Sequence, residues 1–292
     1  MKIITENSNV ILKNVRDFDL THIFDCGQCF RWNQLDENKY AGVAKGRALT
    51  ISQDGDTVVF HNTTERDFHD IWYNYFDFDT DYGEIKAELS KDSVMREAIT
   101  YGEGIRILNQ DLWETVVSFI ISASNNIPRI KGIVERLCAA YGEEINYGGD
   151  IYYTFPSIDK MSMLTKEDLG VIRAGFRDKY IIDAVSRFKN GELSEDALYK
   201  MSTPEAKKSL MTITGVGNKV SDCILLFGLK RADSFPVDVW IKRIMEYCYF
   251  GGVTQPVDKI NTFAEERFGK LGGYAQQYLF FYARENKLGL GD

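Results

Sequence analysis

The spacing of apolar residues changes once along this 292-residue chain, and that change limits the folds it can adopt. Residues 29–61 contain short segments with strand-like apolar spacing, which read CFRW, YAGVA, ALTISQ and TVVFH. Asp54-Gly55, between the last two, is a hairpin-turn dipeptide, so we expect an antiparallel sheet. From about residue 84 the spacing becomes helical and stays helical to the end. The sequence therefore predicts an α+β protein with an N-terminal antiparallel β-sheet domain followed by an all-α body.

The domain boundaries follow from motifs, because no internal repeat, low-complexity tract or Pro/Gly-rich linker divides the chain. We place the N-terminal sheet domain at residues 1–105. The all-α body is expected in two parts. Residues 106–203 form a helical subdomain with an asparagine loop, and residues 204–292 form a subdomain with a glycine hairpin between two helices.

Several classes of protein are excluded by apolar content and cysteine content. The longest apolar runs, at 116–123 and 223–229, are far shorter than the ~20 residues of a membrane-spanning helix. The first residues have no apolar signal-peptide core, so we expect an intracellular protein without a membrane partner. We also expect a monomer. The five cysteines are odd in number and scattered, so neither a disulfide framework nor a metal site is predicted.

The net charge of −8 would argue against nucleic-acid binding if it were spread evenly along the chain, but it is not. Residues 1–103 hold 11 basic and 19 acidic side chains, whereas residues 173–243 hold 13 basic and 9 acidic ones. The acidic excess therefore lies in the N-terminal part, and a basic face further along the chain remains compatible with DNA.

Two apolar helices are predicted over residues 111–123 and 128–142, joined by a polar loop with Asn125 and Asn126. Asn126 is a suitable N-cap for the second helix. Arg129 lies in the first turn of that helix, where the helix dipole disfavours a cation. It is either an ordinary surface arginine or a donor aimed at an acceptor outside the protein.

Residues 202–229 predict two short helices joined by a tight turn that contains Gly215 and Gly217. A Gly-x-Gly turn at a helix N-terminus directs backbone N–H groups outward, which suits a phosphate. Such contacts carry no base preference. The same turn also occurs in helical bundles without DNA, so the hairpin alone leaves both interpretations open.

Lys219 follows this turn and Asp238 comes later in the chain, and together they suggest covalent chemistry. A lysine beside the amide dipoles of a helix N-terminus holds its proton less tightly, which leaves free amine for nucleophilic attack. Cys223 lies one turn further on the same helix face. Asp238 either caps the next helix or stabilises positive charge that develops on a sugar ring. The alternatives without catalysis are a solvated surface lysine at position 219 and a helix cap at position 238.

Six motifs in order carry a resemblance that spans nearly the whole chain. They are GQCFRW (27–32), SFIISASNNIPRIKGIVERLC (118–138), GFRDKY (175–180), GVGNKVSDC (215–223), PVDV (236–239) and YAQQYLFF (274–281). Together they resemble the 8-oxoguanine DNA glycosylases of the helix-hairpin-helix superfamily. The resemblance implies a helix-hairpin-helix glycosylase body and a bifunctional DNA repair glycosylase/AP lyase. Such an enzyme excises 8-oxoguanine from double-stranded DNA by base flipping, Schiff base formation at Lys219 and β-elimination.

The resemblance also implies roles for single residues. Lys219 is the expected nucleophile and Asp238 the assisting carboxylate. The Gly27 carbonyl would accept the N7 hydrogen that 8-oxoguanine has and guanine lacks. Gln276 would bind the base edge, with Phe280 and Cys223 on opposite faces of the ring. Gln276 and Phe280 are spaced i,i+4, which places them on one helix face, although a solvated Gln276 and a core Phe280 would otherwise be expected.

The expected contacts to DNA come from the asparagine loop, the hairpin and an aromatic wedge. Phe176 would enter the base stack, and Arg129 and Arg177 would donate to an opposite cytosine. The complete DNA-binding set is Asn125, Asn126, Arg129, Phe176, Arg177, Gly215, Gly217 and Trp240. No metal or cofactor is expected in the chemistry, although a monovalent cation fits the hairpin carbonyls.

Four positions depart from the family pattern. Trp240 and Ala283 replace a histidine and its acidic partner found in animal members, so phosphate contact there is expected to differ. Ser124 replaces an asparagine and Phe176 a tyrosine, which puts the preference for the opposite base in doubt.

Two other functions remain as alternatives. The first is a helix-hairpin-helix glycosylase for alkylated or other damaged bases, which would lack the nucleophilic lysine. The second is a hairpin protein that binds DNA without catalysis. The expected location is DNA-associated, in the cytoplasm or nucleoid of a prokaryote or the nucleus of a eukaryote.

Overall fold

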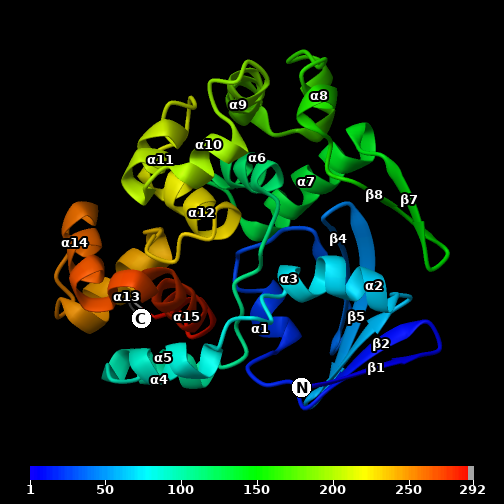
Figure 1. The fold of residues 1–292 in the computed structure, drawn as a ribbon. Coiled ribbons are helices and arrows are strands. Elements are labelled where there is room, and N and C mark those ends of the chain that lie inside the picture. Colours follow the sequence, from blue (N-terminus) through cyan, green and yellow to red (C-terminus); the bar gives the residue numbers. More distant parts are fainter. Residues whose placement is uncertain (289–292) are drawn as a thin grey trace.

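A six-stranded antiparallel sheet forms much of the N-terminal part of the molecule, and helices form most of the rest (Figure 1). The computed structural model describes residues 1–288, so the last four residues of the predicted third domain lie outside the description. The sheet has the strand order β1-β2-β6-β5-β4-β3. The strands are Lys2–Glu6 (β1), Asn9–Lys13 (β2), Trp32–Asp36 (β3), Lys39–Ala44 (β4), Arg47–Asp54 (β5) and Thr57–His61 (β6).

Three of the four strands predicted within residues 29–61 are confirmed as β4, β5 and β6. The strand predicted over residues 29–32 is wrong, because residues 29–31 belong to a loop and β3 begins at Trp32. β5 and β6 join through the predicted turn, where Gly55 has a φ of 55°. The hairpin β1–β2 is an addition to the prediction. Its turn contains Asn7 and Ser8, both at positive φ, and β2 extends the sheet by pairing with β6.

Helices cover the sheet and build the body. The short helices near the sheet are Leu20–Phe24 (α1), Glu65–Asp67 (α2) and Tyr73–Tyr75 (α3), the last two linked by a π-helical turn at Phe68–Trp72. The body helices are Tyr82–Leu89 (α4), Ser93–Tyr101 (α5), Leu112–Ser122 (α6), Ile127–Tyr141 (α7), Ile158–Met161 (α8), Asp178–Lys189 (α9), Glu195–Lys200 (α10), Thr203–Leu210 (α11), Asn218–Gly228 (α12), Val239–Tyr249 (α13), Val257–Phe268 (α14) and Gly272–Glu285 (α15). Among the described residues, no helix has the length and apolar character needed to cross a membrane.

The body is not entirely helical, which corrects the prediction. Glu144–Tyr147 (β7) and Asp150–Tyr153 (β8) form a hairpin that reaches back toward the sheet domain (Figure 1). Gly148 and Gly149 both have positive φ in its turn. The Tyr147 hydroxyl donates to the His61 carbonyl at 2.6 Å and accepts from the Thr50 N–H at 2.9 Å. This tyrosine therefore fastens the helical body to the sheet.

The largest apolar core joins the helical elements. The stripe predicted for residues 128–142 is buried in α7, and α6 is buried along most of its length. Helices α4 and α5 contribute Leu89, Met95 and Ala98 to this same core. Residues 82–105, placed with the sheet domain in the sequence-based division, thus pack with the helical body.

Asp92 ties α5 to α14, and its removal is expected to destabilise the body. Its carboxylate accepts from the Val94 and Met95 N–H groups and from the Arg267 side chain. Burial raises the pKa of Asp92, but these donors overcompensate and lower it below its ordinary value. Because the pKa is lowered on folding, this stabilisation is complete above the unfolded-state pKa and is lost as the pH falls through the folded-state pKa.

We expect Asp92→Ala to lower the free energy of unfolding by about 2–3 kcal/mol at neutral pH, measured by urea denaturation. Asp81→Ala is the matched control, because Asp81 caps α4 at an exposed position without an arginine partner. Its cost should be about 1 kcal/mol. Equal losses in the two variants would contradict a special role for the link to α14.

Candidate active site

One pocket brings together the residues that the sequence assigns to catalysis and base recognition. It has a volume of about 110 Å³ and lies between the loop before β3, the helices α6, α7, α12 and α15, and the segment before α13. Its walls are formed by Cys26, Gly27, Phe30, Phe119, Ser122, Asn125, Ile127, Ile130, Lys219, Cys223, Phe227, Pro236, Asp238, Gln276, Gln277 and Phe280. The predicted catalytic pair and the predicted base-binding set therefore share one cavity.

Lys219 enters this pocket from the first turn of α12. Its Nζ lies 3.4 Å from Ser122 Oγ and 5.4 Å from the centre of the Phe119 ring. Ser122 donates its own hydroxyl hydrogen to the Phe119 carbonyl at 2.8 Å, so its lone pairs are free to accept from Lys219. Ser122 and Phe119 orient the lysine, and the sequence did not single out either residue because the contact joins α6 to α12.

Cys223 forms the wall one turn below Lys219. Burial raises the pKa of its thiol to about 11, although the positive charge of Lys219 partly opposes this. The group is therefore neutral at pH 7 and presents an apolar, polarisable surface.

Asp238 has the first of the two roles between which the sequence left a choice, that of a helix cap, and its role in catalysis stays a prediction. Its Oδ1 accepts from the Ile241 N–H at 2.8 Å, which makes it the N-cap of α13. It also lines the pocket with Lys219. Burial raises the pKa of Asp238, while the Ile241 N–H and the Lys219 charge act in the opposite direction.

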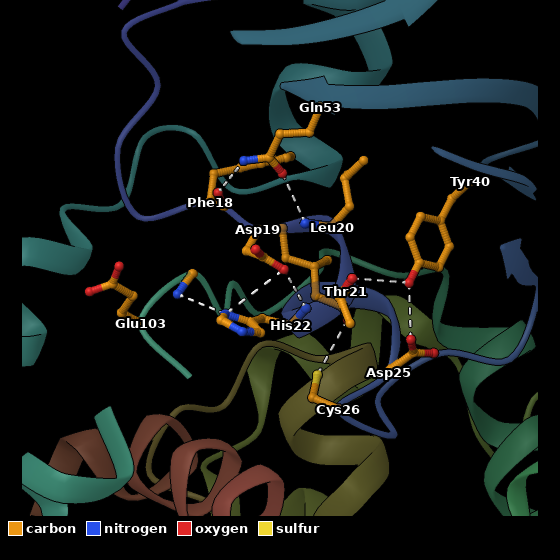
Figure 2. Close-up of polar contacts among 12 residues, drawn as sticks. Phe18, Asp19, Leu20, Thr21, His22, Asp25, Cys26, Tyr40, Gln53 and Glu103 are labelled. Atoms are coloured by element: carbon orange, nitrogen blue, oxygen red, sulfur yellow. Dashed lines mark hydrogen bonds and ion pairs between the residues drawn. The ribbon is translucent and has the colours of Figure 1, made fainter. Parts of the chain in front are cut away.

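The loop that carries Gly27 is fixed from both sides. Figure 2 shows the preceding segment tied to the sheet, with Gln53 bonded to Phe18 and Leu20, and Tyr40 donating to Asp25. On the other side, buried Gln28 donates to the carbonyls of Ile23 and Arg106. These bonds hold the Gly27 backbone at the mouth of the pocket.

Gly27 cannot carry a side chain without disturbing the pocket. Its φ is 75°, and an added Cβ would lie 2.9 Å from Phe280 Cε1. We expect Gly27→Ala to lower the excision rate about 10- to 100-fold under single-turnover conditions, because Phe280 or the loop must move. Gly46→Ala is the matched control: it has a similar φ of 71° but no neighbour within 4 Å, so it should lose stability without losing activity.

Gln276 is buried, which rules out the solvated alternative considered for it. Its Oε1 accepts from the Nε2 of the adjacent Gln277 at 2.8 Å. Phe280 lines the same pocket from the same helix, as the i,i+4 spacing predicted. Gln277 also lines the pocket. It was not predicted there, because adjacent residues of a helix point in different directions and Gln276 was already assigned to the pocket.

The side-chain amides of the asparagine loop form hydrogen bonds with the backbone of the loop and its flanking helices. Asn125 donates to the Ile121 carbonyl at 3.0 Å and accepts from the Asn126 N–H at 3.1 Å. Asn126 caps α7 by accepting from the Arg129 N–H, as predicted. Ser124, directly before Asn125, has a φ of 49°. The loop is thus a preformed turn beside the pocket.

Arg177 supports this loop from beneath. It is buried, and its guanidinium donates to the carbonyls of Ala123, Ser124 and Ala174. Its cationic carbon lies 4.4 Å from the centre of the Phe176 ring, and that ring is exposed. Burial lowers the pKa of Arg177, and the charge of nearby Arg129 lowers it further. The expected contact of Arg177 with an opposite cytosine stays a prediction.

The hairpin between α11 and α12 has the expected form. Ser202 and Glu205 make the predicted capping box of α11. Gly215 has a φ of 82°, and an added Cβ would overlap the Tyr180 ring at 2.4 Å. Gly217 is the N-cap of α12 and has no side chain to cap it, so the first-turn N–H groups of α12 can face an external acceptor.

The remaining predicted positions lie nearby or inside the core. Trp240 is half-buried in the first turn of α13, with the Arg243 guanidinium 5.4 Å from the centre of its ring. Ala283 is fully buried. All five cysteines are free thiols. Within residues 1–288, no three His, Cys, Asp or Glu side chains gather as metal ligands.

Known proteins match the chain in sequence and in structure. Residues 10–116 match the family described as 8-oxoguanine DNA glycosylase, N-terminal domain. The N-glycosylase/DNA lyase of Saccharomyces cerevisiae is 30% identical over 261 residues, which cover 81% of this chain and 69% of that protein. The chain belongs to the 8-oxoguanine DNA glycosylase family.

Two solved structures of such glycosylases are similar over almost their whole length. The Clostridium acetobutylicum 8-oxoguanine glycosylase/lyase, in complex with dsDNA containing cytosine opposite 8-oxoG, is 43% identical with a TM-score of 0.95, and the match covers 99% of both chains. MBOgg1 in complex with a low affinity DNA ligand is 48% identical with a TM-score of 0.95, over 98% of this chain and 99% of that one. The predicted family and fold class are confirmed.

Proposed function

We propose that this chain excises 8-oxoguanine from duplex DNA and then cleaves the strand as an AP lyase, with Lys219 as the nucleophile. The observation that carries the proposal is the convergence of Lys219, Asp238 and the Gly27 loop on one pocket. A base inside a duplex is out of reach of this pocket, so the target nucleotide must be flipped out of the stack at a cost of a few kcal/mol.

The chemistry follows from the two ionisable groups. The unprotonated Lys219 amine bonds to the anomeric carbon of the sugar, and the bond from that carbon to the base breaks with its electron pair on the departing base, which takes up a proton. The nitrogen then gives up one proton as the bond between the anomeric carbon and the ring oxygen breaks, the ring oxygen takes up a proton, and a protonated Schiff base remains. Loss of a proton from the adjacent sugar carbon then expels the 3′ phosphate by β-elimination. Asp238 stabilises the positive charge that develops on the sugar.

Recognition of the base uses the opposite end of the pocket. The Gly27 carbonyl would accept the N7 hydrogen of 8-oxoguanine, and Gln276 would bind the Watson–Crick edge. Phe280 and Cys223 would face the two sides of the ring. Burial keeps Cys223 neutral, which suits contact with an aromatic face.

Contacts to the DNA backbone and to the gap left by the flipped base come from outside the pocket. The amides after Gly215 and Gly217 would hold a phosphate, which requires no basic side chain and explains how an acidic protein binds DNA. The exposed Phe176 ring would insert into the gap in the base stack, and the Arg177 guanidinium contacts that ring. Asn125 and Asn126 would line the same gap, and half-buried Trp240 would lie beside a backbone phosphate.

The test is borohydride trapping on a duplex with one 8-oxoguanine. A stable covalent adduct is expected, because borohydride reduces a Schiff base between Lys219 and the sugar. If no adduct forms on this duplex and none forms on an abasic duplex, the lyase mechanism is overturned. An adduct on the abasic duplex alone would overturn the choice of 8-oxoguanine.

Arg129 is expected to recognise the base opposite the lesion. Its side chain is exposed in the first turn of α7 and makes no hydrogen bond or ion pair with the part of the chain that the structure describes. We expect Arg129→Ala to reduce the preference for opposite cytosine about 10-fold, since a hydrogen bond to a base is worth about 1–3 kcal/mol. Excision rates against each of the four opposite bases check this. Identical preferences in both proteins would contradict it.

The alternative functions find less support in the site. A glycosylase for alkylated bases has no use for a nucleophilic lysine, and a DNA-binding module has no use for a buried pocket that holds Asp238 and Gln276. A family member that acts on DNA is DNA-associated inside the cell, and we propose the nucleoid or the nucleus according to the type of cell.

A further inference from the structure

Gln277 has an acceptor that the protein does not satisfy. The side chain is 2% exposed and lines the pocket from α15. Its Nε2 donates to Gln276 Oε1 at 2.8 Å, but its own Oε1 is buried and has no hydrogen-bond partner within residues 1–288. A buried acceptor without a partner costs free energy in the folded protein, so its presence at a binding pocket points to a ligand that supplies the donor.

The bond between the two glutamines sets the polarity of both amides. Gln276 Oε1 already accepts one hydrogen bond from Gln277, whereas Gln276 Nε2 forms none with the described residues. Gln277 Oε1 is a buried acceptor without a partner among those residues. The pair therefore has one unpaired donor and one unpaired acceptor, and both residues line the pocket.

This pattern is complementary to one type of base edge. A guanine-type Watson–Crick edge carries an acceptor at O6, followed by donors at N1 and the 2-amino group. An adenine-type edge carries a donor at position 6, an acceptor at N1 and no 2-amino group. The donor and acceptor of the amide pair are complementary to the guanine-type edge. Against the adenine-type edge they would place donor against donor and acceptor against acceptor.

We propose that Gln277 is a second base-reading residue, whose Oε1 accepts a hydrogen bond from the N1 and 2-amino donor edge of the flipped base while the Gln276 amide donates to O6. The proposal rests on the proposed function, because it assumes that a flipped 8-oxoguanine enters this pocket. It adds selection for a guanine skeleton to the reading of N7 by Gly27. A flipped 8-oxoadenine has the same N7 hydrogen, so Gly27 alone cannot reject it.

The experiment compares affinities for two lesions in the absence of turnover. Lys219→Gln protein, with and without Gln277→Leu, is titrated with duplexes that contain 8-oxoguanine, 8-oxoadenine or guanine at one position. We expect Gln277→Leu to weaken binding to 8-oxoguanine by about 10- to 100-fold and to change binding to 8-oxoadenine by less than about 2-fold. The preference between the two lesions should fall accordingly.

Tyr278→Phe is the matched control in the same background. The Tyr278 hydroxyl is also buried on α15 without a partner among the described residues, but Tyr278 does not line the pocket. This variant should leave the preference between the lesions unchanged. Gln277→Leu with native Lys219 should still form the borohydride adduct on an abasic duplex, which has no base to read, and this result shows that the fold is intact.

The outcomes separate this proposal from the proposed function. Suppose first that the parent protein prefers 8-oxoguanine to guanine. The role of Gln277 alone is then overturned if Gln277→Leu loses affinity equally for 8-oxoguanine and 8-oxoadenine, or loses none for either. Equal affinity of the parent protein for 8-oxoguanine and guanine would overturn both.

Discussion

Replacement of Lys219 by glutamine is expected to abolish the borohydride-trapped adduct and to lower the excision rate by at least about 10³-fold, the scale on which a covalent nucleophile contributes. Glutamine has no basic amine, so it forms neither the bond to the sugar nor the Schiff base. The fold should not suffer, because Lys219 lies in the first turn of α12, where the helix dipole disfavours a cation. The free energy of unfolding should stay the same or rise by up to about 1 kcal/mol.

Lys208→Gln is the matched control for this change. Lys208 is an exposed lysine on α11, the other helix of the hairpin, and it does not line the pocket. The substitution removes the same charge a short distance away, so DNA affinity falls slightly through electrostatics while the adduct still forms. Loss of the adduct in both variants would show that overall charge, and not the Lys219 amine, limits the reaction.

The local features of this fold were predictable from the sequence because local interactions produce them. Strands β4 to β6 follow from apolar spacing and a turn dipeptide, and the capping box at Ser202 fixes the start of α11. Asp238 was recognisable as a cap from its position before a helix. Its place beside Lys219 depended on the family resemblance, since the two residues are 19 positions apart in the sequence.

The hairpin β7–β8 shows where local reasoning ends. Its strands are four residues each, and an isolated hairpin of this kind is marginal in water. Its position depends on the hydrogen bonds of Tyr147 to the sheet, which join residues more than 80 positions apart. The Gly148-Gly149 dipeptide between two aromatic-containing segments was the available indication.

Within the site, the unpredicted residues are those defined by contacts between elements. Ser122 meets Lys219 only because α6 packs against α12, and the two residues are 97 positions apart in the sequence. Arg177 is expected to contact the opposite base, and in this structure its guanidinium also holds the backbone of the asparagine loop. The sequence did not indicate this second contact, because it joins positions more than 50 residues apart.

Replacement of Asp238 by asparagine is expected to lower the excision rate by about 10²- to 10⁴-fold without loss of stability. Asparagine caps helices as well as aspartate does, so the bond from the Ile241 N–H to position 238 can be retained. What disappears is the negative charge that stabilises positive charge on the sugar. Urea denaturation measures the first part of this expectation, and single-turnover excision measures the second.

The pH dependence provides an independent readout of the same group. Burial raises the pKa of Asp238, and only the carboxylate is active, so kcat/KM should fall with decreasing pH at values above the ordinary range of an aspartate. The Asp238→Asn protein should lose this titration from its acid limb, while the need for the unprotonated Lys219 amine remains. Asp111→Asn is the control, because Asp111 caps α6 in the same way, accepting from the Glu114 N–H at 3.0 Å, but lies outside the pocket. An unchanged acid limb in Asp238→Asn would assign the titration to another group and leave Asp238 with the role of a cap.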